Sequence, residues 1–233
     1  MPELILASSS PRRVELLNQL NLVFRIVPPD IDETLLRSES HLKYVSRMSR
    51  EKAETVFASE AKNEDNNGGN IVLSGDTVVI VDGELLGKPI DENDAIDMLQ
   101  RLSDNTHQVI TSISVMGKTK KNVDGVMNRG KAFFLETLLV TTNVRFRSVT
   151  VDECKSYWRT GEPVDKAGGY GIQGLGAIFV ESLEGSYSNV VGLPLAETAQ
   201  LLSVFGVECL LVHENVYKSL GETKLLGEVV RHG

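Results

Sequence analysis

The fold is decided first at Leu4-Ile5-Leu6-Ala7-Ser8-Ser9-Ser10-Pro11-Arg12-Arg13, where a short apolar run passes through three serines into a proline and two arginines. The apolar run predicts a buried strand. Ser10 is a typical helix N-cap and Pro11 suits the first helical position, so a helix is predicted to begin here. Its buried face is predicted to contain Val14, Leu17 and Leu20. The stretch therefore predicts a strand, a short polar loop and a helix in direct succession.

The same alternation of apolar runs and helical periodicity continues along the chain. Further strands are predicted at Phe24–Val27, Ile71–Leu73, Val78–Val81, Glu84–Leu86, Gln108–Met116, Leu138–Val149, Ile178–Val180 and Leu210–Val212. Further helices are predicted at Ser40–Ala61, at Asp91–Leu102, from Thr150 or Asp152 to Trp158, and at Leu195–Phe205. Asp82-Gly83 is a strong type I′ turn signal, so the strands on either side of it should form a hairpin.

These elements predict an α/β fold, and the length of 233 residues suits a single domain. We place that domain at residues 1–213. The polar stretch 214–233 is predicted to be a C-terminal appendage. Polar, glycine-containing segments at 62–70 and 117–131 are predicted to be surface loops.

Composition excludes several other classes of protein. Hydrophobic residues make up 41% and charged residues 24% of the chain, as in an ordinary globular protein. No apolar run suits a membrane span, and the amino terminus lacks the basic flank of a secretory signal. The two cysteines, Cys154 and Cys209, predict neither a disulfide framework nor a zinc ribbon, so a cytoplasmic location without membrane contact is expected. The net charge of −8 argues against binding to nucleic acid polymers.

Arg12 and Arg13 make the first helix the best candidate for a ligand site. A helix N-terminus offers unpaired N–H groups and a partial positive charge, so it favours anions and disfavours cations. Two arginines in the first turn are explained if they bind a phosphate, and equally if they are solvated side chains on a structural helix. The phosphate loop GxxxxGK[ST] is absent, which excludes a P-loop enzyme.

Three other residues are candidates, each with a simpler alternative. Lys52 lies on the apolar stripe of its predicted helix, either with its ammonium at the stripe's edge in solvent or as a cation facing a ligand cleft. Asp76 follows a predicted strand, where it is either an ordinary turn residue or a group that holds a metal or activates water. Lys88 is either solvated or functional.

The segment from Asp165 to Gly174 contains four glycines, which indicate either a close approach to a ligand or a series of tight turns. The four histidines, His41, His107, His213 and His232, show no metal-ligand spacing and are interpreted as structural or exposed.

Taken together, these stretches resemble the Maf family of nucleoside triphosphate pyrophosphatases. The opening stretch Leu4–Arg13 resembles the phosphate-binding motif of that family. The blocks that continue the resemblance in order are Arg50-Glu51-Lys52-Ala53, Gly75-Asp76-Thr77-Val78-Val79, Gly87-Lys88-Pro89, His107-Gln108-Val109-Ile110-Thr111, Thr142-Asn143-Val144-Arg145-Phe146, Glu162-Pro163 through Gly174, Gly185-Ser186-Tyr187 and Val191-Gly192-Leu193-Pro194. The similarity covers roughly residues 3–206.

The resemblance implies an elongated mixed sheet with flanking helices, in two lobes around a central groove, related to the inosine-triphosphate pyrophosphatase fold. It implies hydrolysis of a nucleoside triphosphate to the monophosphate and pyrophosphate. Asp76 would be the catalytic base, and Glu33 would join it in holding Mg²⁺ or Mn²⁺. Ser8, Arg13 and the catalytic lysines Lys52 and Lys88 would bind the triphosphate.

The resemblance also bears on the choice of nucleotide. Three positions separate a subfamily that prefers dTTP and UTP from one that prefers 7-methyl-GTP. Arg12, Thr77 and Gln173 occupy them here and resemble the dTTP/UTP type, with modified pyrimidine nucleotides as further candidates. A neutral Gln173 suits a pyrimidine carbonyl, whereas a cationic methylated purine would favour an acidic or aromatic partner.

The family resemblance implies a homodimer. A second hypothesis is a nucleotide-binding regulator of cell division that has lost turnover, but the joint presence of Glu33, Lys52, Asp76 and Lys88 favours the enzyme.

Overall fold

The structure is a computed structural model that describes residues 3–61, 69–118 and 133–209. The predicted loops 62–70 and 117–131 lie largely outside these ranges. The predicted strand Leu210–Val212 and the appendage 214–233 lie wholly outside them. Within the described ranges, no helix combines the length and the apolar character needed to cross a bilayer.

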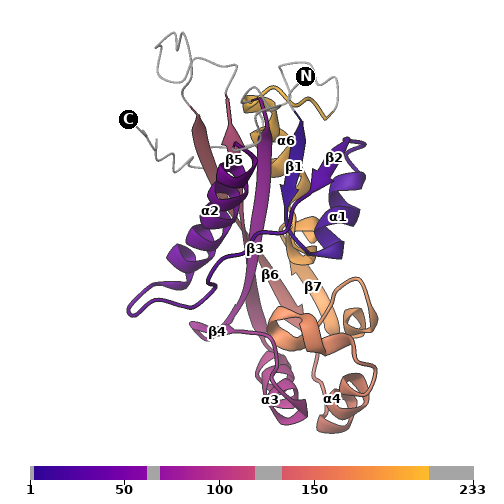
Figure 1. The fold of residues 1–233 in the computed structure, drawn as a ribbon. Coiled ribbons are helices and arrows are strands. Elements are labelled where there is room, and N and C mark those ends of the chain that lie inside the picture. The colour runs from indigo at the N-terminus through magenta and orange to yellow at the C-terminus, as the bar shows by residue number, and fades with distance from the viewer. Residues whose placement is uncertain (1–2, 62–68, 119–132, 210–233) are drawn as a thin grey trace.

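The described residues form one elongated seven-stranded sheet (Figure 1). The strands are β1 (Leu4–Ala7), β2 (Phe24–Ile26), β3 (Ile71–Val81), β4 (Glu84–Leu86), β5 (Thr106–Gly117), β6 (Phe134–Phe146) and β7 (Val180–Glu184). Their order is β2-β1-β3-β5-β6-β7, and β4 pairs with β3. β1 runs parallel to β2 and β3, while the other pairs are antiparallel. This mixed sheet confirms the predicted α/β class.

Helices flank the sheet on both faces. They are α1 (Pro11–Asn18), α2 (His41–Glu60), α3 (Glu92–Leu102), α4 (Val151–Trp158), α5 (Tyr187–Val191) and α6 (Leu195–Val204), with 3₁₀ segments at Glu162–Asp165, Ala167–Gly169 and Leu175–Phe179. Of the two candidate caps of α4, the structure uses Thr150, which forms a capping box with Glu153. The Asp91 side chain caps α3 by accepting a hydrogen bond from the backbone N–H of Asp94.

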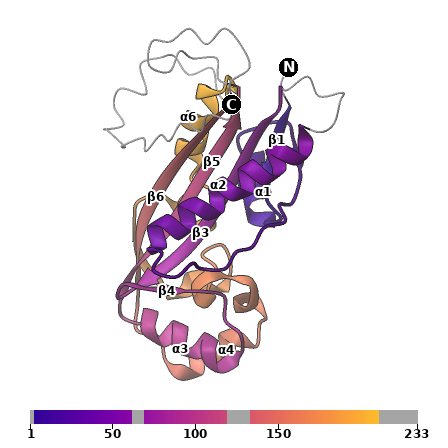
Figure 2. The ribbon, with the colours of Figure 1, turned by 60° about the vertical axis from the view of Figure 1, so that its left-hand side comes forward.

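Side chains alternate along the strands, so the sheet has two buried faces. The molecule also has two lobes, one at each end of the long strands. In the first lobe, Leu4 and Leu6 pack with α1 and α6, while Ile5 and Ala7 pack with α2 on the opposite face. Figure 2 shows α2 lying along its face of the sheet. β3, β5 and β6 continue into a second lobe, where α3 and α4 cover them. The long strands therefore connect the two lobes.

The strand predicted at Leu138–Val149 is observed as Phe134–Phe146, and two further predicted strand boundaries are wrong. Asp76 does not follow a strand, because β3 continues through it and pairs with β5 from Val72 to Ile80. The strand predicted at Ile178–Val180 begins instead at Val180, because the preceding residues form a 3₁₀ turn. In both places the pairing partner lies far away in sequence, so local composition does not reveal it.

One edge of β3 is only partly covered, and this positions the functional site. β1 pairs along that edge as far as Ala7, opposite Ser74. β4 joins the same edge only where Leu86 lies opposite Val79. Between Ser74 and Val79, the edge of β3 therefore lacks both neighbours. We call this interval the edge gap.

Candidate active site

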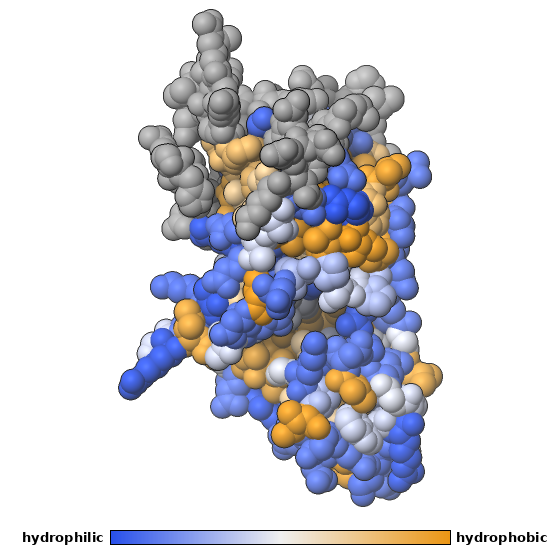
Figure 3. Space-filling model, in the orientation of Figure 1, coloured by the Kyte–Doolittle hydropathy of each residue, from blue (hydrophilic) through white to orange (hydrophobic). Residues whose placement is uncertain are grey.

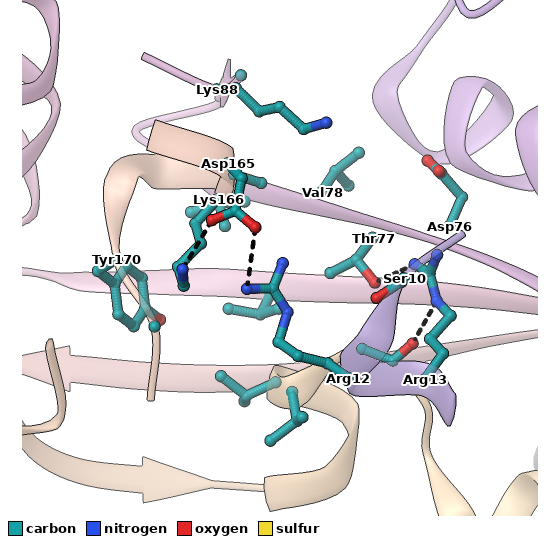
Figure 4. A pocket seen from close by; sticks show the side chains of 18 of the residues that line it. Ser10, Arg12, Arg13, Asp76, Thr77, Val78, Lys88, Asp165, Lys166 and Tyr170 are labelled. Atoms are coloured by element: carbon teal, nitrogen blue, oxygen red, sulfur yellow. Dashed lines mark hydrogen bonds and ion pairs between the residues drawn. The ribbon is translucent and has the colours of Figure 1, made fainter. Parts of the chain in front are cut away.

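A cleft of about 810 Å³ opens at the edge gap and is lined by residues of both lobes (Figure 4). In Figure 3, the surface is hollowed at this level of the molecule. All residues predicted to form the site line this cleft: Ser8, Arg12, Arg13, Glu33, Lys52, Asp76, Thr77, Lys88 and Gln173. Asp76 and Thr77 point to opposite faces of β3. Both reach the cleft because this edge of the strand is uncovered.

Arg13 is held by three neutral acceptors. Its Nε donates to the Gly192 carbonyl at 2.9 Å, one terminal nitrogen donates to Thr77 Oγ1 at 3.1 Å, and the other donates to Ser8 Oγ at 3.4 Å. Burial lowers the pKa of Arg13 from its ordinary value, and the nearby Asp76 carboxylate partly offsets this effect. A guanidinium has five N–H donors and stays charged at neutral pH, so two donors remain beyond those used by the described residues.

The N-terminus of α1 opens onto the same cleft. Ser10 is the N-cap residue and Pro11 is the first helical residue, as predicted, but the Ser10 side chain makes no capping hydrogen bond. The Ser10 N–H instead donates to Ser8 Oγ at 3.1 Å. Arg12 extends from the first turn toward Asp165 of the second lobe, at 3.9 Å. Uncapped N–H groups beside two arginines form an anion-binding arrangement.

Lys52 joins two carboxylates at the floor of the site. Its side chain comes from α2 and the residue is only 7% exposed. Its Nζ lies 2.7 Å from Glu33 and 2.8 Å from Asp76. The ammonium therefore faces the cleft rather than solvent at the edge of the helix. Tyr44, also on α2, fixes the Glu33 segment by donating its hydroxyl to the Glu33 carbonyl at 2.9 Å.

The two carboxylates fit a divalent cation that binds together with a phosphate. Burial raises the pKa of Glu33, but the hydrogen bond and charge of Lys52 outweigh burial and hold that pKa below its ordinary value. Within the described residues, no group of three or more His, Cys, Asp or Glu could form a closed metal cage. Mg²⁺ is commonly held by one or two carboxylates, with waters and substrate phosphates completing its shell. Glu33 and Asp76 match that kind of site.

The second lobe contributes a cation to the opposite side of the cleft. Lys88 extends into the cleft in Figure 4. Among the described residues, it has no hydrogen-bond or ion-pair partner. Its charge helps to lower the pKa of Glu33. Lys88 therefore acts electrostatically across the cleft, while no described residue pairs with its ammonium.

The glycine-rich segment is held by the carboxylate of Glu162, which stands in a family-like block but is not among the predicted site residues. Glu162 accepts hydrogen bonds from the Tyr157 hydroxyl at 2.7 Å, the Leu175 N–H at 2.8 Å and the Gly176 N–H at 3.1 Å. Burial raises the pKa of Glu162, but these hydrogen bonds outweigh burial and lower it. Gln173, just before this turn, is exposed where it lines the cleft. Glu162 thus fixes the backbone that presents Gln173.

His107 is buried, in agreement with the prediction that the histidines are either structural or exposed. Its Nε2 lies 2.8 Å from the Tyr170 hydroxyl, and Tyr170 forms part of the cleft wall. Desolvation lowers the pKa of His107 to about 4, so the ring is neutral at physiological pH. His213 and His232 lie outside the described residues.

Fold and cleft together define an α/β protein with a two-lobed binding site for an anionic small molecule. The chain belongs to the Maf family, since the family model described as "Maf-like protein" matches residues 3–205.

Curated relatives agree with this assignment. The dTTP/UTP pyrophosphatase of Vibrio vulnificus strain YJ016 is 46% identical over 205 residues, covering 88% of this chain and 100% of the relative. That of Hahella chejuensis is 44% identical, covering 88% and 93%. That of Colwellia psychrerythraea is 46% identical, covering 88% and 89%. A solved structure, the Staphylococcus aureus Ham1 protein, aligns with 61% of this chain and 71% of its own at 15% identity and a TM-score of 0.34.

Proposed function

We propose that this protein is a nucleoside triphosphate pyrophosphatase that hydrolyses dTTP and UTP, and by extension modified pyrimidine nucleotides, to the monophosphate and pyrophosphate. The relatives named above support the substrate class. The observation that carries the proposal is one cleft in which a carboxylate, Asp76, faces three cations, Arg13, Lys52 and Lys88. That arrangement suits water attack on a phosphorus atom whose leaving group is an anionic phosphate.

The chemical step needs a base, and Asp76 is the proposed one. Asp76 accepts a proton from water as the water oxygen forms a bond to the α-phosphorus. The bond from the α-phosphorus to the bridging oxygen breaks, and its electron pair leaves with pyrophosphate. Lys52 sets the position of the carboxylate through its 2.8 Å contact.

The cations are proposed to hold the triphosphate and to stabilise the departing charge. Arg13 offers its two remaining donors from the first lobe, beside the N-terminus of α1 and Ser8. Lys88 offers an unpaired ammonium from the second lobe. A Mg²⁺ or Mn²⁺ ion at Glu33 and Asp76 would, when bound, neutralise phosphate charge and polarise the phosphoryl group.

The pyrimidine base of the nucleotide is proposed to lie against the second lobe, where Gln173 is exposed to the cleft. A neutral amide both donates and accepts, so it suits a pyrimidine edge. Arg12 and Thr77 are the other two proposed specificity positions. We further propose that residues 1–213 act as one domain, that the protein is a homodimer, and that it works in the cytoplasm, where its free thiols at Cys154 and Cys209 would stay reduced.

The decisive experiment measures pyrophosphate release from dTTP, UTP, CTP, GTP and 7-methyl-GTP with Mg²⁺ or Mn²⁺, and again after addition of EDTA. We expect rapid release from dTTP and UTP that requires the metal. Preference for 7-methyl-GTP would overturn the assignment of the specificity positions. Nucleotide binding without release from any substrate would overturn the enzyme and favour the non-hydrolysing regulator.

A further inference from the structure

A line of hydrogen bonds runs behind Arg13, and its direction is fixed. Arg13 can only donate, so Thr77 Oγ1 accepts at 3.1 Å. Thr111 donates to the Asn189 carbonyl at 2.9 Å, because a carbonyl only accepts. The two threonine hydroxyls lie 3.0 Å apart, and the single hydrogen of Thr111 is already engaged. Thr77 must therefore donate to Thr111.

The line ends at the last turn of α5, which also holds Arg13 directly. Asn189 and Gly192 both present carbonyls there, one to Thr111 and one to the Nε of Arg13. Such carbonyls lack partners inside a helix and need donors from elsewhere. Gly192 has a φ of +124°, a backbone conformation that glycine adopts readily.

The residues beneath this line of hydrogen bonds are held in place by further contacts. Asn189 is fully buried, and its side chain donates to the Val109 carbonyl at 3.0 Å and to Thr142 Oγ1 at 2.9 Å, which ties α5 to β5 and β6. Thr111 is also fully buried and pairs directly with Thr77 across β3 and β5. Neither Thr111 nor Asn189 lines the cleft.

We propose that Thr111 is a positioning residue for Arg13, and that Thr77 acts on the substrate through Arg13 rather than by contacting the base. The inference rests on the proposed function and revises one of its assignments, because Thr77 would then support phosphate binding and not the choice of nucleotide. The hydroxyl hydrogen of Thr77 is engaged by Thr111, so it is not available to a nucleotide. Removing the Thr111 hydroxyl would release that hydrogen and loosen the acceptor that orients the guanidinium. The effect should fall on the phosphates, which all nucleoside triphosphates share.

The test is a double-mutant cycle between Thr111→Val and Arg13→Lys, read as kcat/KM for dTTP and CTP. Thr111→Val keeps the shape of the side chain and removes one hydroxyl. We expect it to lower kcat/KM about tenfold, and by the same factor for both nucleotides. In the Arg13→Lys background it should change kcat/KM by less than about twofold, because no guanidinium remains to be oriented. Thr111→Ser should restore activity.

Thr137→Val is the matched control. The Thr137 hydroxyl contacts Ser114 at 2.8 Å, in a buried serine cluster under α2 that does not reach Arg13. This variant should leave kcat/KM unchanged. An equal loss from Thr111→Val in both Arg13 backgrounds would overturn the inference, and so would a change in the ratio of dTTP to CTP activity.

Pyrophosphate binding, measured by calorimetry, separates this inference from the proposed function. Thr111→Val should weaken pyrophosphate binding about tenfold, whether or not the wild-type protein hydrolyses nucleotides. If the wild type hydrolyses no nucleotide while Thr111→Val still weakens pyrophosphate binding, the proposed function alone is overturned. Unchanged pyrophosphate affinity in Thr111→Val, or no pyrophosphate binding by the wild type, would overturn the positioning role.

Discussion

The two walls of the cleft are built on different principles. On the first-lobe wall, Arg13 and Lys52 are each fixed by two or more protein acceptors and come from regular helices. On the second-lobe wall, Lys88 has no partner among the described residues, and Gln173 is presented by short 3₁₀ turns rich in glycine. The first wall holds its charges before a ligand arrives. The second wall keeps its polar groups available and fixes only the backbone beneath them.

This difference matches what each wall has to recognise. A reaction at phosphorus benefits from charges whose positions are already fixed, because no reorganisation is then needed in the transition state. A nucleotide base is distinguished by polar groups of the protein that make no hydrogen bond until the base binds. Four predictions, which use five substitutions, test whether the walls divide the work in this way.

The largest effect is expected on the first wall, from Asp76→Asn. The amide keeps the size of the side chain but accepts no proton from water, so pyrophosphate release should fall at least about a thousandfold. The fold should persist because Lys52 retains Glu33 as a partner. Pyrophosphate release and thermal unfolding are the measurements. A variant that keeps more than a tenth of the activity would contradict Asp76 as the base.

Next in size is a matched pair, Lys52→Met and Lys88→Met, which removes one cation from each wall. Lys52→Met leaves Glu33 and Asp76 facing each other, so activity should fall about a hundredfold and the free energy of unfolding by about 2 kcal/mol, a value reduced because Glu33 is partly exposed. Lys88→Met should lower activity about tenfold with stability unchanged, since no protein partner is lost. Equal loss of stability in both variants would show that the walls do not differ.

A smaller effect is expected under the second wall, where His107 supports Tyr170. The folded-state pKa of about 4 lies below the ordinary value of 6.5, so the unfolded chain takes up a proton that the native protein excludes. The contribution is complete above pH 6.5 and is lost as the pH falls toward 4. Denaturant titrations at pH 7 and pH 5 should show wild type losing about 2 kcal/mol more than His107→Gln. His41→Gln is the control and should retain the wild-type pH dependence.

The smallest effect is expected from Glu162→Gln, which alters only the support of Gln173. The –NH₂ group of the introduced amide must then face one of the donors from Tyr157, Leu175 and Gly176. The free energy of unfolding should therefore fall by about 1 kcal/mol. The ratio of dTTP to CTP hydrolysis should change more than the turnover of dTTP. Glu184→Gln removes an exposed carboxylate in the same lobe and serves as the control. An unchanged ratio would separate Glu162 from base selection.

Much of the fold could be predicted because its signals are local. The hairpin at Asp82-Gly83 was predicted from two residues, and both have the positive φ that a type I′ turn requires. The β1–α1 unit was predicted in the same way, and so was a cap at Thr150 or Asp152, of which the structure uses Thr150. The continuity of β3 through Asp76 was not, because it depends on pairing with β5 more than 30 residues later in the chain.

The site shows the same division. The residues that line the cleft carry charge or stand in family-like motifs, so the sequence pointed to them. Thr111 and Asn189 support those residues from behind, while Glu162 lines the cleft and holds the backbone beside Gln173. Thr111 and Glu162 stand in family-like blocks, but their roles depend on strand register and loop geometry. Only a correct pairing of Thr77 with Thr111 would have shown what the Thr111 hydroxyl does.

The alternation of Asp76 and Thr77 at the edge gap has a consequence for sequence change. The two neighbours send their side chains to opposite faces, one to Lys52 and the other to Arg13. Loss or gain of a single residue in β3 near the gap would exchange the two faces and disconnect both cations together. Insertions and deletions in this part of β3 should therefore abolish function even where the chain still folds.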